Sequence, residues 1–205
     1  MTESNSLNIL PVPIAQLIRK IESAAAIDNS MLLAWLAESD LEVADILSFS
    51  YFNHPGRESY GRNQIYLSTR VKIFVMSWNP GDFTAIHDHE PSEWGAVQFF
   101  GDISHRLYSV DGNIIRLKQS DTLHSGMRVG VNGRLIHAMG NHSGNPVLTL
   151  HIYGTNSNFD GSWRTRVYEP EKKRVILTDG SAFLDRTDSN FEILGKIGFD
   201  EAATD

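Results

Sequence analysis

The sequence contains no cysteine. This absence excludes disulfide bonds, thiolate metal ligands and a cysteine nucleophile, so any site must be built from other side chains. It also fits a reducing compartment, where structural disulfides are rare. Metal binding would therefore depend on the eight histidines and on the acidic residues.

Long apolar runs and clusters of basic residues are also missing. No apolar segment approaches the roughly 20 residues that a membrane helix needs, and the first ten residues have neither the cationic region nor the apolar core of a secretory signal. Lysines and arginines are scattered and the net charge is −7, whereas nucleic-acid-binding proteins carry a basic stripe. We therefore expect a cytoplasmic protein that binds neither membrane nor nucleic acid.

The length of 205 residues suits one domain with its own apolar core. We expect a single domain over residues 1–205, in which the first part, about 1–50, is helical. A β-barrel is expected over about 51–178, and a C-terminal extension over 179–205.

The helical block is predicted from apolar spacing and capping signals. The apolar positions of one helix face are Ile14, Leu17, Ile18 and Ile21. Asn29 or Ser30 is expected to cap a short second helix. Ser39 and Glu42 have the spacing of a capping box before a third helix over residues 41–47.

The pattern then changes to short β-rich segments separated by turn signals such as Asp111-Gly112 and Asn132-Gly133. Strand candidates lie at residues 71–78, 84–89, 95–100, 104–109, 114–117, 128–131, 134–139, 147–153, 164–168 and 174–177. Many short strands at close spacing are typical of an antiparallel sandwich or barrel.

Two histidines flank an aspartate in the sequence His87-Asp88-His89. Because side chains alternate along a strand, both imidazoles lie on one face and Asp88 points to the other. Two imidazoles on one face can share a metal ion, and His137 is the best candidate for a third ligand from a neighbouring strand. An isolated pair of this kind is more often a polar strand end, so the interpretation depends on the surrounding residues.

Those surroundings resemble the two motifs of the cupins. Gly81, then His87 and His89, then Glu93 and Gly101 are spaced like the first motif. The spacing of Gly133, His137 and Asn141 resembles the second motif.

The resemblance implies a mainly β fold, the jelly-roll-like antiparallel barrel of the cupins, behind an N-terminal helical block. It also implies a metal ion held by His87, His89 and His137. His124 has no partner in these motifs. The remaining histidines outside the motifs, His54, His105 and His142, are interpreted as surface or turn residues.

Within the cupins the chain is similar to the thiol dioxygenases of the cysteine dioxygenase type, over roughly residues 55–170. The similarity is carried by Tyr60-Gly-Arg62-Asn63, by Trp78-Asn-Pro-Gly81 before the histidine pair, by Ile136-His137 with Asn141, and by Thr149-Leu-His151-Ile-Tyr153. It implies that Arg62, with Tyr60, binds a substrate carboxylate. It also implies that Thr149, His151 and Tyr153 lie beside an iron ion, and that the Tyr153 hydroxyl forms a hydrogen bond with the oxygen or the thiolate.

The residues themselves are consistent with these roles. Leu148, Leu150 and Ile152 alternate with Thr149, His151 and Tyr153, so one face of this strand is apolar and the other polar. A hydroxyl, an imidazole and a phenol can satisfy one another's hydrogen bonds inside a barrel. The planar guanidinium of Arg62 matches a carboxylate at two positions.

The chain also departs from the family. The cysteine that many animal members crosslink to the tyrosine is absent; its position falls on Trp94, and Gly95 follows one residue later. Glu93 is a candidate fourth ligand of the kind found in other cupins. Thr149 replaces a serine and keeps the hydroxyl.

We therefore predict an Fe(II)-dependent thiol dioxygenase that converts L-cysteine, or a similar small thiol carboxylate, to its sulfinic acid with O2. One alternative is a 3-mercaptopropionate dioxygenase, although such members tend to carry Gln at the position of Arg62. Another is a non-thiol metal cupin (an isomerase, a carbon dioxygenase or a binding protein) with Glu93 as fourth ligand. The expected partners are the thiol and O2, and the expected state is a monomer or weak homo-oligomer.

Overall fold

Three short helices precede the sheets in the computed structural model, which describes residues 9–157, 163–184 and 191–200. They are α2 (Val12–Ser23), α3 (Asn29–Glu38) and α4 (Val43–Ile46), and the 3-10 turn η2 (Leu47–Phe49) follows. The predicted apolar face of α2 is confirmed, because all four of its residues are buried. Among the helices of these ranges, none combines the length and the apolar character that a membrane span requires.

Two capping predictions were wrong. Asp28, rather than Asn29 or Ser30, caps α3, because its side chain accepts a hydrogen bond from Met31 N. Ser39 ends α3 instead of starting the next helix. Glu42 and Asp45 form the capping box of α4. The side chain of each accepts a hydrogen bond from the backbone N–H of the other.

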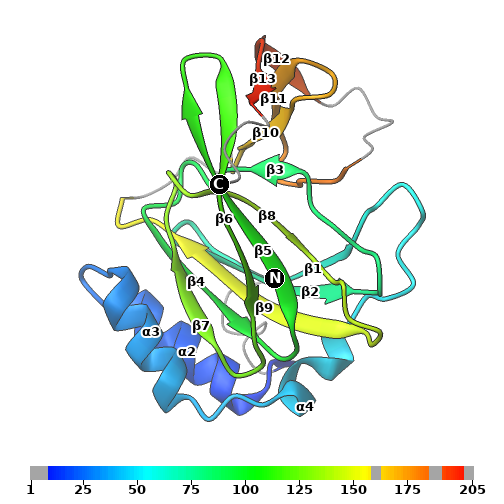
Figure 1. The fold of residues 1–205 in the computed structure, drawn as a ribbon. Coiled ribbons are helices and arrows are strands. Elements are labelled where there is room, and N and C mark those ends of the chain that lie inside the picture. The colour runs from blue at the N-terminus through cyan, green and yellow to red at the C-terminus, as the bar shows by residue number, and fades with distance from the viewer. Residues whose placement is uncertain (1–8, 158–162, 185–190, 201–205) are drawn as a thin grey trace.

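The β-strands form two sheets (Figure 1). In spatial order the first sheet contains β1 (Gly61–Leu67), β2 (Val71–Trp78), β9 (Val147–Gly154), β4 (Trp94–Phe99) and β7 (Arg128–Val131). The second contains β12 (Glu192–Gly195), β11 (Arg174–Thr178), β10 (Thr165–Glu169), β3 (Ile86–His87), β8 (Ile136–Gly140), β5 (Ile103–Asp111), β6 (Ile114–Leu123) and β13 (Gly198–Asp200). The recorded pairs are antiparallel except for the parallel pair of β6 and β13.

Alternation along the first sheet separates two cores. Val71, Ile73 and Val75 of β2 pack in one apolar cluster with the residues of α2 and α3. Phe74 and Met76 belong to a second cluster that also contains residues of β5 and β8, so this face lies between the two sheets. The predicted fold class, a mainly β jelly-roll-like barrel behind a helical block, is confirmed.

The sequence prediction missed three strands. β1 was missed because its residue alternation is interrupted by a register shift between Gln64 and Tyr66. β12 and β13 lie in the segment that was predicted as a C-terminal extension, and they add strands to the second sheet.

Candidate metal centre

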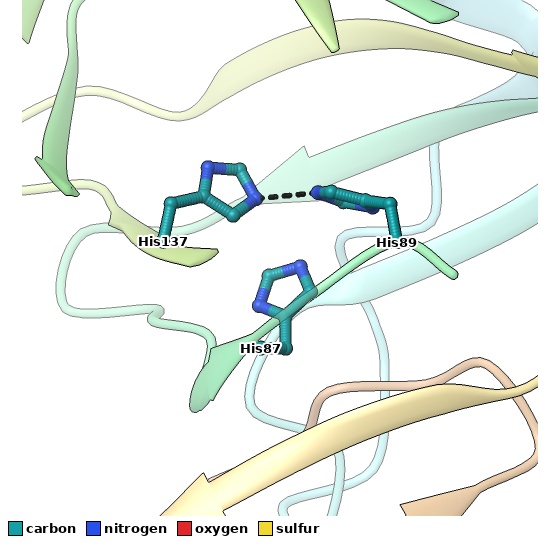
Figure 2. A group of neighbouring side chains, drawn as sticks. All are labelled: His87, His89 and His137. Carbon is teal, nitrogen blue, oxygen red and sulfur yellow. Dashed lines mark hydrogen bonds between the residues drawn. The ribbon is translucent and has the colours of Figure 1, made fainter. Parts of the chain in front are cut away.

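Two neighbouring strands of the second sheet bring three histidines together. His87 ends β3, His89 follows it in the chain, and His137 lies on β8, where it is paired in register with His87. Figure 2 shows the three imidazoles directed toward one another. The strand pairing thus places residues 50 positions apart in the sequence at one point.

The geometry of this cluster fits one metal ion. One ring nitrogen from each of His87, His89 and His137 lies within 4.8 Å of the other two, and all three side chains are buried. His89 Nε2 and His137 Nε2 are 2.8 Å apart. Three imidazole nitrogens converging at this spacing are a donor set that could hold a divalent metal.

The histidines are held in the uncharged form that binds metals. Burial is the largest cause in each case: it lowers the pKa of His87 to about 4, and the pKa values of His89 and His137 fall well below the ordinary value. The neighbouring imidazoles lower the last two further. At neutral pH the cluster therefore presents lone pairs rather than positive charge.

Hydrogen bonds outside the cluster fix which ring nitrogen faces it. His87 Nδ1 donates to the carbonyl of Ala85 at 2.9 Å, which leaves Nε2 as the free lone pair. His137 Nδ1 lies 2.8 Å from His105 Nε2. For His137 Nε2 to bind a metal, its Nδ1 must carry the proton and donate it to His105.

The interpretation of His105 as a surface or turn residue is therefore wrong. It lies on β5, it is 7% exposed, and its Nε2 contacts the ring nitrogen of His137 that faces away from the cluster. Sequence reasoning missed it because a lone histidine in an alternating strand carries no spacing signal; only the pairing of Leu107 with His137 reveals its neighbour.

We expect the substitution His105→Leu to weaken metal binding by about 10- to 100-fold, because His137 loses the acceptor that orients its ring. His105→Gln offers a carbonyl oxygen to the same N–H and should retain most of the affinity. Competition with a chromophoric chelator measures both values. Equal affinities for the leucine variant and the unsubstituted protein would contradict this role.

Asp88 points away from the histidines, as predicted. Its side chain accepts a hydrogen bond from Arg166 N at 3.0 Å and lies 3.5 Å from the Arg166 guanidinium. Burial raises the pKa of Asp88 to about 6, and the contacts with Arg166 oppose this shift. The carboxylate therefore fastens β3 to β10 and does not act as a ligand.

Glu93 also lies outside the cluster. Its carboxylate accepts hydrogen bonds from Asn156 N at 2.8 Å and from Ser157 Oγ at 3.3 Å, on an exposed loop. The structure thus gives Glu93 a loop-fastening position instead of the fourth-ligand position considered from the sequence. The three histidines form the donor set without a carboxylate among the described residues.

A polar chain runs along β9 next to the histidines. Thr149 Oγ1 is 2.8 Å from His151 Nε2, and His151 Nδ1 is 2.7 Å from the Tyr153 hydroxyl. The Tyr153 ring stacks on His89, with ring centroids 4.9 Å apart. The structure therefore brings together the three residues predicted to lie beside the metal.

One assignment of donors and acceptors satisfies every contact in this chain. Trp78 Nε1 can only donate, and it donates to Thr149 Oγ1 at 2.9 Å. All contacts are satisfied if Thr149 then donates to His151 Nε2, and His151 Nδ1 donates to the Tyr153 oxygen. The Tyr153 O–H is then left to donate into the cavity.

Burial also keeps the His151 imidazole and the Tyr153 phenol uncharged. It lowers the pKa of His151 to about 3 and raises the pKa of Tyr153 above its ordinary range. Tyr153 is thus a hydrogen-bond donor, not a phenolate, over the whole neutral range.

A small cavity opens in front of these groups. Arg62, Tyr60, His87, His89 and Tyr153 line it. The Arg62 guanidinium lies 3.9 Å from the centre of the Phe74 ring, and it has no hydrogen bond or ion pair within the described ranges. Tyr60 stacks on Trp78, and its hydroxyl accepts a hydrogen bond from Ala182 N at 3.2 Å. The two predicted substrate-binding residues thus lie in the cavity with two of the histidines.

The residue next to Tyr153 is Gly95, not Trp94. Gly95 pairs with Tyr153, and a Cβ on Gly95 would lie 3.1 Å from Tyr153 Cδ1. Trp94 is buried in the apolar cluster beneath the helices, where its ring contacts Gly154. Trp94 is therefore not among the residues that line the cavity, and Gly95 is the residue beside Tyr153.

Lys72 is the cavity residue that sequence reasoning missed. It lies on β2 opposite Tyr153 and is 6% exposed. One signal in the sequence could have identified it: Lys72 is the only charged residue in the otherwise apolar strand predicted at 71–78.

The other histidines lie away from the cluster. His54, interpreted as a surface or turn residue, is largely covered, and its Nε2 lies 2.9 Å from Asp82 Oδ2. His124 is exposed, and its Nδ1 lies 3.2 Å from Asp102 Oδ2. His142 is exposed, as predicted.

No family model matches the chain. The solved structures similar to it include a putative sugar phosphate isomerase from Acidithiobacillus ferrooxidans (14% identity, 76% of this chain and 90% of that one, TM-score 0.45). Another is TT1209 from Thermus thermophilus (19% identity, 56% and 97%, TM-score 0.44). A third is the cupin domain of a transcriptional regulator from Enterobacter cloacae (18% identity, 48% and 98%, TM-score 0.38).

Proposed function

We propose that this chain is an Fe(II)-dependent thiol dioxygenase that converts L-cysteine, or a similar small thiol carboxylate, to its sulfinic acid. The reaction adds both atoms of O2 to the sulfur of R–SH and gives R–SO2H, so it needs no further reductant. The observation that carries the proposal is one cavity lined by two histidines of the cluster, a phenol donor, and a guanidinium that has no hydrogen bond or ion pair within the described ranges.

The histidine cluster supports the metal part of the proposal. His87, His89 and His137 are neutral and buried, and they supply three nitrogen donors without a carboxylate. When bound, Fe(II) would supply positions at which a thiolate and O2 can meet. A neutral ligand set leaves the full charge of the cation available to favour the thiolate form of the substrate.

Arg62 supports recognition of a carboxylate. Its guanidinium lies 3.9 Å from the centre of the Phe74 ring and has no anionic partner within the described ranges. A substrate carboxylate would provide that partner through two parallel hydrogen bonds. With the carboxylate at Arg62, the sulfur end of a short substrate is directed toward His87 and His89, which line the same cavity.

Tyr153 supports the chemistry at sulfur. The chain from Trp78 through Thr149 and His151 orients the Tyr153 O–H into the cavity, next to His89. A fixed neutral donor at this position can hydrogen-bond an oxygen or thiolate that carries developing negative charge. No proton needs to leave Tyr153 for this role.

The test is anaerobic Fe(II) loading, followed by oxygen uptake with cysteine, 3-mercaptopropionate and cysteamine, with sulfinate assayed. We expect one sulfinate per O2 with cysteine. Arg62→Met should raise the KM for the two carboxylate thiols by at least about tenfold, since a charged hydrogen bond contributes about 1.5–3 kcal/mol. The KM for cysteamine, which has no carboxylate, should not rise. Arg134→Met, at an exposed arginine, is the matched control. Iron binding without uptake on any of the three thiols would exclude thiol dioxygenation and leave a metal protein for another small anion.

A further inference from the structure

Two cationic side chains converge on the space above Gly180. A Cβ on Gly180 would lie 3.6 Å from Arg62 Nη2 and 3.9 Å from Lys72 Nζ. Gly180 has a φ of +93°, and the same Cβ would lie 3.0 Å from the carbonyl oxygen of Trp163, so a side chain is disfavoured at this position. The glycine therefore keeps open the space that both cations reach.

Neither cation is neutralised by the described part of the protein. Lys72 Nζ lies 4.3 Å from the ring centre of Trp163 and 5.5 Å from that of Tyr153, and within the described ranges it has no hydrogen bond or ion pair. Aromatic faces offset only part of the cost of burying an ammonium group. The described residues that line the cavity include no aspartate or glutamate. The missing counter-charge is therefore expected from a ligand.

We propose that Lys72 and Arg62 together bind a single substrate carboxylate above Gly180, so that Lys72 is a second substrate-binding residue that selects anionic thiols. Arg62 matches the carboxylate plane through its paired donors, and Lys72 adds a point charge from the neighbouring strand. The identity of the ligand as a thiol rests on the proposed function, whereas the recognition of a small carboxylate does not.

The charge state of Lys72 agrees with this arrangement. Burial and, to a smaller extent, Arg62 lower the pKa of Lys72 to about 7. A carboxylate bound between the two cations supplies opposite charge and favours the ammonium form. A substrate with a protonated amine and no carboxylate, such as cysteamine, would instead meet two like charges.

Binding to the protein loaded with redox-inert Zn(II) tests the proposal without turnover. The probes are 3-mercaptopropionate and 1-propanethiol, of similar length, of which only the first carries a carboxylate. Under anaerobic titration at pH 6.5, Lys72→Met should weaken 3-mercaptopropionate binding by at least about tenfold and leave 1-propanethiol unchanged. Lys72→Arg, which keeps a cation, should restore most of the affinity. Lys118→Met, at an exposed lysine, should have no effect.

The outcomes separate this inference from the proposed function. Unchanged 3-mercaptopropionate binding in Lys72→Met, an equal loss for both probes, or no binding of 3-mercaptopropionate by the unsubstituted protein would overturn the role of Lys72. Carboxylate-dependent binding in a protein that takes up no oxygen would uphold the two-cation site and reject the dioxygenase. Sulfinate formation with the same KM in Lys72→Met as in the unsubstituted protein would uphold the dioxygenase and reject the role of Lys72.

Discussion

His137→Ala is expected to remove the metal and, with it, the activity. His137 Nε2 faces His89 and its Nδ1 faces His105, so this ring connects the cluster to its outer support. Loss of an outer support alone costs about 10- to 100-fold in metal affinity, and loss of a ligand should cost at least about 100-fold. Metal content after gel filtration, measured by elemental analysis, gives the result.

The matched control for this experiment is His124→Ala. That imidazole is exposed, lies 3.2 Å from Asp102 and is not part of the histidine cluster, so the variant should keep its metal. Circular dichroism confirms that both variants are folded. Stoichiometric metal in folded His137→Ala protein would show that the three histidines are not the ligand set.

Lys72→Met is expected to make the ligand-free protein more stable at neutral pH, by about 2 kcal/mol. Methionine has a similar shape and removes a buried ammonium group that has no hydrogen bond or ion pair within the described ranges. Replacing even a paired buried charge by apolar residues can gain about 1–4 kcal/mol. For a chain of this length the gain corresponds to a rise in Tm of about 4–8 °C. Thermal unfolding of both proteins at several pH values measures it.

The pH dependence has a definite sign. The folded pKa of Lys72 is about 7, below the unfolded value of 10.5. Between these values the unfolded chain holds a proton that the folded chain has lost, so the stability of the lysine protein rises with pH. Below pH 7 both states are protonated and the full penalty remains. The advantage of Lys72→Met should therefore be greatest at pH 6 and shrink toward pH 10.

Lys118→Met, which changes an exposed lysine, should shift the stability by no more than about 0.5 kcal/mol at any pH. If Lys72→Met were less stable than the unsubstituted protein throughout this range, the ammonium group would have to be paired. Taken with the binding test, a stability gain together with a loss of carboxylate affinity would mean that the charge is kept for recognition at a cost to the fold.

Residue spacing and composition within one segment were sufficient to predict some of the helices and strands. The α2 face was predicted from its apolar spacing, and the strand at Val71–Trp78 from its β-rich composition ahead of a turn signal; both are confirmed. The same reasoning placed His87 and His89 on one face with Asp88 on the other. Capping was less predictable, since Asp28, Asn29 and Ser30 are all good caps and the geometry of the turn chooses among them.

The site residues divide along the same line. The histidine pair, the third histidine candidate and the polar alternation of β9 can be predicted from the amino-acid sequence, because each is a spacing or a motif within one segment. The contact of His105 with His137, the loop position of Glu93, and the approach of Lys72 and Arg62 to Gly180 are found only in the folded chain. These relations depend on the register between strands and on which charges are left without partners within the described ranges. The side-chain alternation of a single strand predicts neither.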